Sequence, residues 1–254
     1  MSGFAAFFDK ELLEIRRTWR LWVIPSMLLF FGITSPILAL VTPSLLSSIA
    51  GAQPGVVITV PTPTALDAGA QFLKSLSQLV IFALIIGGAG AVSGERSSGT
   101  AVLALTKPLS RGAFVLAKVI ADTLLLIVST IIGTLVCGAL TRVLFESVDW
   151  RSLVAAVAVW LVFALLVTAA MHLFSVWCRS RGAAAGAGLA FLFLMLLAGI
   201  WPPMSRYTFV GLTGVASRAL ARQPVEWGWP VATALALAIA CVLAAVRLFE
   251  RQEL

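Results

Sequence analysis

The sequence predicts an all-α integral membrane protein with six transmembrane helices, an interfacial helix at the N-terminus and one short helix on the cytoplasmic side. Hydrophobic residues make up 60% of the 254 residues and charged residues only 11%, and the mean hydropathy is +1.04. An average soluble domain carries about 25% charged residues, so this chain has too little polar surface to face water on all sides. Six apolar stretches are also long enough to cross a bilayer as helices, which takes about 20 residues each.

Residues 1–20 are predicted to form an amphipathic helix in the membrane interface. Phe4, Phe8, Leu12, Ile15, Trp19 and Trp22 recur at helical spacing, and Arg16, Arg17 and Arg20 fall towards the opposite face. Aromatic side chains then lie at the acyl boundary while basic ones meet anionic lipid headgroups. Glu11 interrupts the apolar face. An ordinary basic segment before the first span is the alternative, whereas a cleaved signal peptide is excluded because the apolar run is too long and lacks an A-x-A-like site.

The whole chain, residues 1–254, is predicted to be a single membrane domain. Its six expected spans are residues 21–42, 72–93, 114–141, 152–177, 183–201 and 229–247. The gap before the second span is rich in proline, but Thr64 with Asp67 three residues later is typical of a helix start. The gap 202–228 contains aromatic residues and scattered arginines, which indicate either short surface helices or a water-exposed loop.

The positions of Lys and Arg predict the orientation. With the N-terminus in the cytoplasm, the inside segments hold 12 of the 18 Lys and Arg residues, and the first outer gap holds none. Cytoplasmic loops carry the excess of positive charge. We therefore expect a multi-pass protein of the plasma (inner) membrane with both termini in the cytoplasm.

A polar stretch, GERSSGTAVLALTKPLSRG, separates the second and third spans at 94–112. Residues 100–106 favour a helix, Pro108 ends it, and Ser110 is placed to cap the third span. Apolar side chains on a short cytoplasmic helix need a partner to cover them. The stretch is thus expected to be a docking element for a soluble protein.

This stretch resembles the corresponding segment of ABC-2 type transporter permeases, the membrane halves of ATP-binding-cassette exporters. The resemblance lies in an acidic residue, a Gly-Thr, a leucine-rich turn, a proline, a Ser-Arg and a lysine in this order. The matching residues are Glu95, Arg96, Gly99, Thr100, Leu103, Leu105, Lys107, Pro108, Ser110, Arg111, Gly112 and Lys118. The N-terminal segment 4–17, the six spans and the chain length are also similar to that family.

The resemblance implies a function and a set of partners. Segment 1–20 would be an elbow helix, and residues 99–107 a coupling helix that docks on an ABC ATPase subunit. A second permease subunit, identical or homologous, would complete the membrane part. ATP and magnesium would bind the ATPase, because this chain has no G-x-x-x-x-G-K-[ST] sequence. We expect no cofactor on this chain, no enzymatic activity of its own and no nucleic-acid partner.

Three polar residues are expected inside the membrane and form a candidate polar site: Lys118, Asp122 and His172. A carboxylate there is costly and often functional, so Asp122 could line a substrate or proton path. It also follows Lys118 by one helical turn, and we favour a structural ion pair between them. His172 is the sole histidine, and a bond to a neighbouring helix is favoured over a functional role.

Other function classes are weighed against this one. Cys137, Cys178 and Cys241 lie at or inside apolar runs without metal-ligand or disulfide spacing, which is typical of packing residues. A non-transporting membrane anchor for a cytoplasmic partner remains an alternative. So does an intramembrane enzyme using Asp122 or His172, although no G-x-S-x-G or H-E-x-x-H sequence is present.

Overall fold

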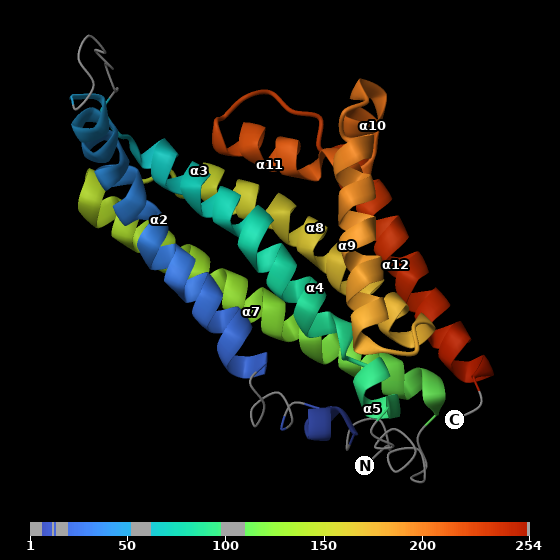
Figure 1. Ribbon diagram of the computed structural model, residues 1–254. Helices are drawn as coiled ribbons and strands as arrows, with labels where there is room; N and C mark the ends of the chain where they lie inside the picture. Colours follow the sequence, from blue (N-terminus) through green and yellow to red (C-terminus); the bar gives the residue numbers. More distant parts are fainter. Residues whose placement is uncertain (1–6, 12, 14–19, 52–61, 98–109, 253–254) are drawn as a thin grey trace.

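The computed structural model describes residues 7–11, 13, 20–51, 62–97 and 110–252. All regular elements among these residues are helical (Figure 1), and six helices are long and apolar enough to cross a membrane. These spans are Trp22–Leu45, Ala65–Ser97, Arg111–Phe145, Trp150–Trp177, Arg181–Ala198 and Gly228–Arg251. The predicted all-α, six-span membrane fold is confirmed.

Five of the spans are single helices and one is composite. Four of the single helices are α7 (Arg111–Phe145), α8 (Trp150–Trp177), α9 (Arg181–Ala198) and α12 (Gly228–Arg251). The first span is α2 (Arg20–Gly51), which contains Pro25, Pro36 and Pro43. The second is a composite of α3 (Ala65–Ser75), a π-helical turn (Leu76–Val80), α4 (Ile81–Ala89) and α5 (Ser93–Ser97).

Helix α8 lies at the centre of the bundle. It contacts α4, α7, α9, α11 and α12, and its large Trp160 is fully buried. Its sequence is apolar around the whole circumference, which is the pattern of a helix surrounded by other helices. The outer spans α9 and α12 bury far less of their surface and present apolar side chains outward.

The first span packs closely against the third because both carry glycine at the crossing. A Cβ added to Gly32 would lie 2.7 Å from the carbonyl oxygen of Gly133, and one added to Gly133 would lie 2.9 Å from the carbonyl oxygen of Leu28. Small residues allow two helix backbones to approach in this way. The contact fixes α2 along α7, as seen in Figure 1.

Two predicted helix starts are confirmed. Helix α3 begins at Ala65, and the Asp67 carboxylate accepts hydrogen bonds from the backbone N–H of Thr64 at 2.8 Å and from its hydroxyl at 2.7 Å. Helix α7 begins at Arg111, and the Ser110 hydroxyl accepts the N–H of Ala113 at 3.2 Å. Both caps satisfy N–H groups that the first helical turn leaves without partners.

The segment between the fifth and sixth spans is largely helical, which is one of the two structures expected for it. It contains α10 (Pro202–Tyr207), a 3-10 turn (Phe209–Gly211) and α11 (Leu212–Leu220). Helix α11 buries Leu212, Val215, Ala216 and Leu220, and it lies against α8 and α3.

A charged contact holds the end of α11 to the start of α8. Arg222 adopts a left-handed φ of 55° and donates from Nε to the Asp149 carboxylate at 2.5 Å. Ser152 donates to the same carboxylate oxygen. These donors hold the pKa of Asp149 well below its usual range, the Arg222 hydrogen bond being the largest cause.

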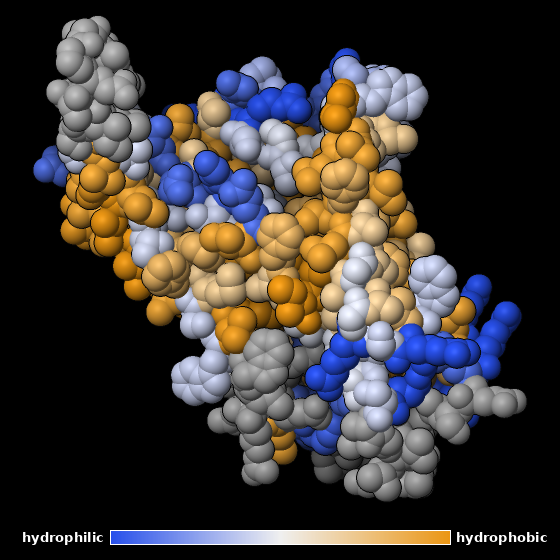
Figure 2. Space-filling view, in the orientation of Figure 1, coloured by the Kyte–Doolittle hydropathy of each residue, from blue (hydrophilic) through white to orange (hydrophobic). Residues whose placement is uncertain are grey.

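The surface is divided by polarity along the bundle. On the face seen in Figure 2, apolar side chains cover most of the middle of the bundle, and hydrophilic residues lie mainly towards its two ends. Exposed apolar side chains include Phe82 and Ile86 of α4 and Leu194 and Leu196 of α9. A band of this kind is expected where lipid tails replace water as the solvent.

The second span, expected at about 72–93, contains a turn near its end. Helix α4 ends at Ala89 and Ser93 begins α5. The Ser175 hydroxyl of α8 explains the turn between them. It accepts the N–H groups of Val92 at 2.9 Å and Ser93 at 3.0 Å, and donates to the Ala89 carbonyl at 3.0 Å.

Candidate functional site

The candidate site lies at the end of the bundle that carries α5, the start of α7 and the end of α12, here called the motif end. Glu95 and Arg96 lie on α5, Arg111 is the first residue of α7, and Lys118 is two turns further along. The other predicted docking residues lie outside the described part of the chain: Gly99, Thr100, Leu103, Leu105, Lys107 and Pro108. The structure therefore describes the helices on either side of 98–109, which are α5 and α7.

Lys118 is the centre of a buried charge cluster. Its ammonium lies 2.9 and 3.0 Å from the two carboxylate oxygens of Glu11 and 2.5 Å from Glu95. Its side chain is 1% exposed and that of Glu11 is 4% exposed. Lys10 lies 3.1 Å from Glu11 and 3.9 Å from Glu95, at the more exposed side of the cluster. The N-terminal helical residues 7–11 are thus joined to α5 and α7.

This cluster corrects one prediction. We expected Lys118 to pair with Asp122 on its own helix, but the ammonium lies against Glu11 and Glu95 instead. Two carboxylates on other segments can surround a buried cation more completely than one residue a turn away, which matters where water cannot complete its hydrogen bonds. Asp122 is found against His172 of α8.

Aromatic rings reinforce the same junction. The Phe114 ring of α7 lies between Phe7, at a centroid distance of 5.2 Å, and Phe249 of α12, at 5.3 Å. The Lys118 ammonium lies 5.1 Å from the Phe114 ring centroid. Apolar burial and cation–π attraction therefore act beside the ion pairs.

The two arginines of the motif hold the end of α12. Arg96 donates to the side-chain oxygen of Gln252 at 2.6 Å and to the Val176 carbonyl at 3.2 Å. Arg111 donates to the Gln252 carbonyl and, at 3.3 Å, to that of Glu250. Gln252 in turn donates to the Val176 carbonyl at 3.0 Å. The last carbonyls of α8 and α12 are satisfied by these cations, as helix C-termini favour.

Arg181, the first residue of α9, lies across the glycines of the second span. A Cβ on Gly94 would lie 2.5 Å from its guanidinium nitrogen, and one on Gly90 would lie 3.2 Å from its Nε. These glycines leave the space that the arginine side chain fills. The start of α9 is therefore joined to α5 at the same end of the bundle.

A second polar feature lies deeper in the membrane part. Asp122 Oδ2 of α7 is 3.3 Å from Nε2 of His172 of α8, and the histidine side chain is 1% exposed. This approach does not have hydrogen-bond geometry, and neither ring nitrogen has a hydrogen-bond partner among the described residues. His172 therefore does contact a neighbouring helix, as expected, through the close approach of its imidazole to the Asp122 carboxylate of α7. Of the predicted polar site, Asp122 and His172 come together and Lys118 does not join them.

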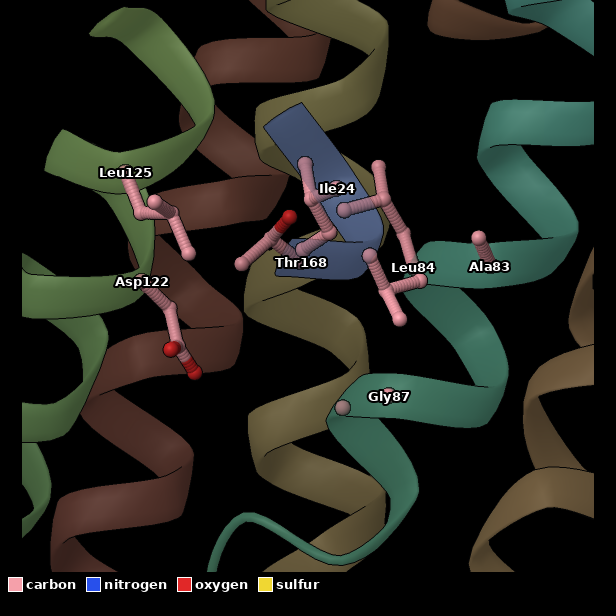
Figure 3. A pocket seen from close by; sticks show the side chains of 9 residues that line it. Ile24, Ala83, Leu84, Gly87, Asp122, Leu125 and Thr168 are labelled. Atoms are coloured by element: carbon pink, nitrogen blue, oxygen red, sulfur yellow. The ribbon is translucent and has the colours of Figure 1, made fainter. Parts of the chain in front are cut away.

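A small cavity opens beside Asp122. Its volume is about 30 Å³, and its lining comes from α2, α4, α7 and α8. Figure 3 shows Asp122 of α7 and Thr168 of α8 among apolar neighbours such as Ile24 and Leu84. Among the described residues, no group of three His, Cys, Asp or Glu side chains is placed to hold a metal ion.

Sequence reasoning missed several residues of the motif end. Glu11 did leave a signal, because it is a charge on the apolar face of an otherwise amphipathic segment. Ser175, Arg181 and Gln252 left none, since a lone serine, arginine or glutamine near a span boundary is common. Their partners are distant in the chain: Ser175 and Val92 are 83 residues apart, and Gln252 and Arg96 are 156 residues apart.

Comparison with known proteins identifies the family. Residues 5–219 match the model of the ABC-2 family transporter proteins. The chain is also 24% identical over 192 residues to the uncharacterized transmembrane protein YxlG of Bacillus subtilis (strain 168), which covers 74% of this chain and 73% of that one. The family match includes the N-terminal segment, the motif around Glu95 and Arg111, and five of the six spans. The chain therefore belongs to the ABC-2 transporter family and is a membrane component of a transporter.

Proposed function

We propose that this chain is the permease subunit of an ATP-binding-cassette exporter, driven by a separate ATPase subunit that docks at the motif end. The observation that carries the proposal is the arrangement around Lys118. One buried ammonium joins the N-terminal segment, α5 and α7 through Glu11 and Glu95. Residues 99–107, which the resemblance makes a coupling helix, lie in the sequence between α5 and α7.

The geometry supports transmission of force from a docked partner into the membrane. A load on 98–109 acts on α5 and on the start of α7, and both are tied to other helices by side-chain contacts. Arg96 links α5 to the ends of α8 and α12, and Arg111 links α7 to the end of α12. The linked helices can therefore move together, as a rigid-body change between two states requires.

The same proposal includes the expected partners and orientation. A second permease subunit, the same or homologous, would pair with this one, and each would bind an ATPase carrying ATP and magnesium. Both termini would face the cytoplasm, since Glu11 of the N-terminal segment and the end of α12 lie at the motif end with the basic residues Arg96, Arg111 and Lys118. Export is the direction expected for most of the family.

Co-purification with the ATPase tests docking. The candidate partner is an ATPase encoded next to this chain, and the variant is Leu103→Asp in the predicted coupling segment. We expect the variant to lose the ATPase, because a charge on the apolar docking face opposes burial. Leu66→Asp is the matched control, since Leu66 is exposed on α3 near the opposite end of the second span, and it should retain the ATPase. Retention by Leu103→Asp would refute docking there.

Two further measurements complete the test. Substrate-stimulated ATPase activity of the co-purified complex distinguishes transport from simple anchoring. For orientation, a single cysteine is placed either in 94–113 or at Ser217 of α11 in a chain lacking Cys137, Cys178 and Cys241. An impermeant thiol reagent on intact cells should label only Ser217→Cys. Labelling within 94–113 would place the motif end outside and contradict the proposal.

A further inference from the structure

We propose that the exposed face of the second span binds an amphiphile with an anionic headgroup. The headgroup would lie in a polar groove beside α3, at the end of the bundle opposite the motif end, and the hydrocarbon chain would lie along α4. As a statement of the substrate class this inference rests on the proposed function, whereas binding itself requires no ATPase.

The first argument is a stripe of polar side chains on α3 and the π-helical turn that follows it. Its members are Asp67, Gln71, Lys74 and Gln78. They recur with helical spacing and so share one face, while Phe72 on the opposite face is fully buried. In Figure 2, hydrophilic side chains lie over α3. Hydrocarbon offers no partner to polar groups, so this face of the span requires water or a polar ligand.

The second argument is the space on both sides of the stripe. An open cavity of about 500 Å³ lies between α3 and α11, and another of about 340 Å³ lies between α3 and α2. Asp67, Ala70 and Lys74 line both cavities. Thr213 and Ser217 of α11 also line the larger one. Its volume is in the range of pockets that bind small molecules.

The third argument is the positive charge around the larger cavity. The exposed Lys74 makes no hydrogen bond or ion pair within the described part of the chain. A guanidinium nitrogen of Arg218 lies 3.9 Å from the position of a Cβ on Gly214, which lines this cavity. The Asp67 carboxylate already accepts hydrogen bonds from the N–H and hydroxyl of Thr64. The two cations therefore favour an anionic group such as a phosphate as the ligand.

The fourth argument is the continuation of the same face into α4. The π-helical turn Leu76–Val80 joins the two helices, and the exposed side chains beyond Gln78 are apolar. Leu79 is 49% exposed, Phe82 is 44% exposed and Ile86 is 64% exposed. A cationic groove that leads into an apolar surface matches a molecule with a charged head and a hydrocarbon tail. A small soluble anion would leave the apolar surface without a partner.

Photochemical cross-linking of a lipid provides the test. The probe is phosphatidylglycerol with a photoactivatable group in its acyl chain, added to the full chain in a neutral detergent. Cross-links mapped by mass spectrometry should fall on 79–86. Lys74→Gln should lower the apparent affinity about five- to tenfold, as expected for loss of one charge-assisted hydrogen bond. Arg142→Gln is the matched control, since Arg142 is exposed at the same end, in the last turn of α7, and should change nothing.

Two further probes separate the head from the tail. Phosphatidylcholine carrying the same photoactivatable group has no net charge and should bind about fivefold more weakly or worse. Glycerol 3-phosphate has the charge without the chains and should not compete at equal concentration. Equal binding of both lipids, competition by glycerol 3-phosphate, or wild-type cross-links that miss 79–86 would overturn the proposal.

A second copy of the chain is the competing occupant of this face. Phe82→Cys in a chain lacking Cys137, Cys178 and Cys241 should not form a disulfide between two chains. Such a disulfide would show that a second copy covers the face and would also overturn the proposal. Because these measurements contain no ATPase, failure of lipid binding and failure of ATPase docking can be told apart.

Discussion

At the scale of single residues, the protein depends on cations placed between segments that are distant in the chain. Lys118 joins Glu11 and Glu95 while nearly excluded from solvent, and Arg222 joins α11 to Asp149 at the opposite end. Removing one member of a buried group leaves the others with uncompensated charge, which is the larger part of the energetic cost. The environment of each cation therefore determines the effect of a mutation there.

Lys118→Met should destabilise the protein by about 3–5 kcal/mol, because two carboxylates lose the cation that neutralises them in a buried site. The measurement is thermal or denaturant unfolding in detergent. Adding Glu11→Gln to Lys118→Met should recover part of the loss, since one of the two carboxylates that lost the Lys118 ammonium becomes neutral. Lys74→Met, at an exposed lysine of α3, is the control and should change stability by no more than about 0.5 kcal/mol. Equal effects of the two methionine variants would contradict the buried cluster.

Asp149→Asn should reduce the melting temperature at neutral pH, and this difference from the wild type should shrink in acid. The pKa of Asp149 is lowered in the folded state, chiefly by Arg222. Its contribution is therefore complete above the unfolded value of about 3.9 and is lost as the pH falls through the lower folded pKa. Asparagine is nearly the same size and keeps an oxygen that can accept from the Ser152 hydroxyl, so the comparison isolates the charge.

Melting curves of both proteins between neutral pH and about pH 3 provide the measurement. Glu226→Gln is the control, because its contact with Arg206 is exposed on both sides. A difference that grew towards acid would have the wrong sign for a lowered pKa and would contradict the Asp149–Arg222 contact.

The residue scale also shows where sequence reasoning fails. Helical spacing relates Lys118 to Asp122, four residues on, but contains no information about Glu11, which is 107 residues away. Asp122 likewise finds its contact on α8. Intramembrane charges could be recognised as candidates from the sequence, whereas their pairing is set by helix packing that spacing does not encode.

At the scale of elements, the second span is the least regular part of the bundle. It passes from α3 through a π-helical turn into α4 and then turns at 90–92 into α5. The Ser175 hydroxyl accepts hydrogen bonds from the backbone N–H groups of Val92 and Ser93 in and beside this turn. A π-helical turn and a side-chain-stabilised break are typical of helices at functional positions. The element carrying Glu95 and Arg96 is thus held by side chains rather than by continuous helix.

Ser175→Ala should loosen the turn between α4 and α5. The buried N–H groups of Val92 and Ser93 would lose their acceptor, and each such group costs about 1–3 kcal/mol. Hydrogen exchange at residues 92–97 should accelerate while exchange in the middle of α8 stays slow. Ser129→Ala is the matched control, since the buried Ser129 hydroxyl donates only within α7, to the Leu125 carbonyl. Unchanged exchange in Ser175→Ala would show that the hydroxyl is dispensable.

At the scale of the whole molecule, composition predicted the architecture well. Apolar length determines which segments can cross a bilayer, so six spans could be found without any knowledge of contacts. Apolar length does not predict which helix lies at the centre of the bundle. Helices α8 and α12 are both strongly apolar, but only α8 is central. Segments 52–61 and 98–109 lie outside the described residues, so the predicted coupling helix stays a prediction.

The apolar band predicts a depth-dependent effect of charge on α12. Ile239 lies near the middle of this helix and is 60% exposed, whereas Leu248 lies near Arg247 and Arg251 and is 37% exposed. Ile239→Arg should reduce the membrane-inserted fraction, because arginine at a span centre costs about 2.5–3.5 kcal/mol. Leu248→Arg should insert normally. Quantifying the protein in washed membranes is the measurement, and equal insertion would show that Ile239 does not meet hydrocarbon.

The contacts of Gln252 have a consequence for biosynthesis. Arg96 and Arg111 both bind this residue, which leaves the ribosome only after all six spans have been made. The end of the second span and the start of the third therefore cannot reach their final positions until the sixth span has been made. A soluble partner that recognises their final arrangement would have to wait for the synthesis of that last span.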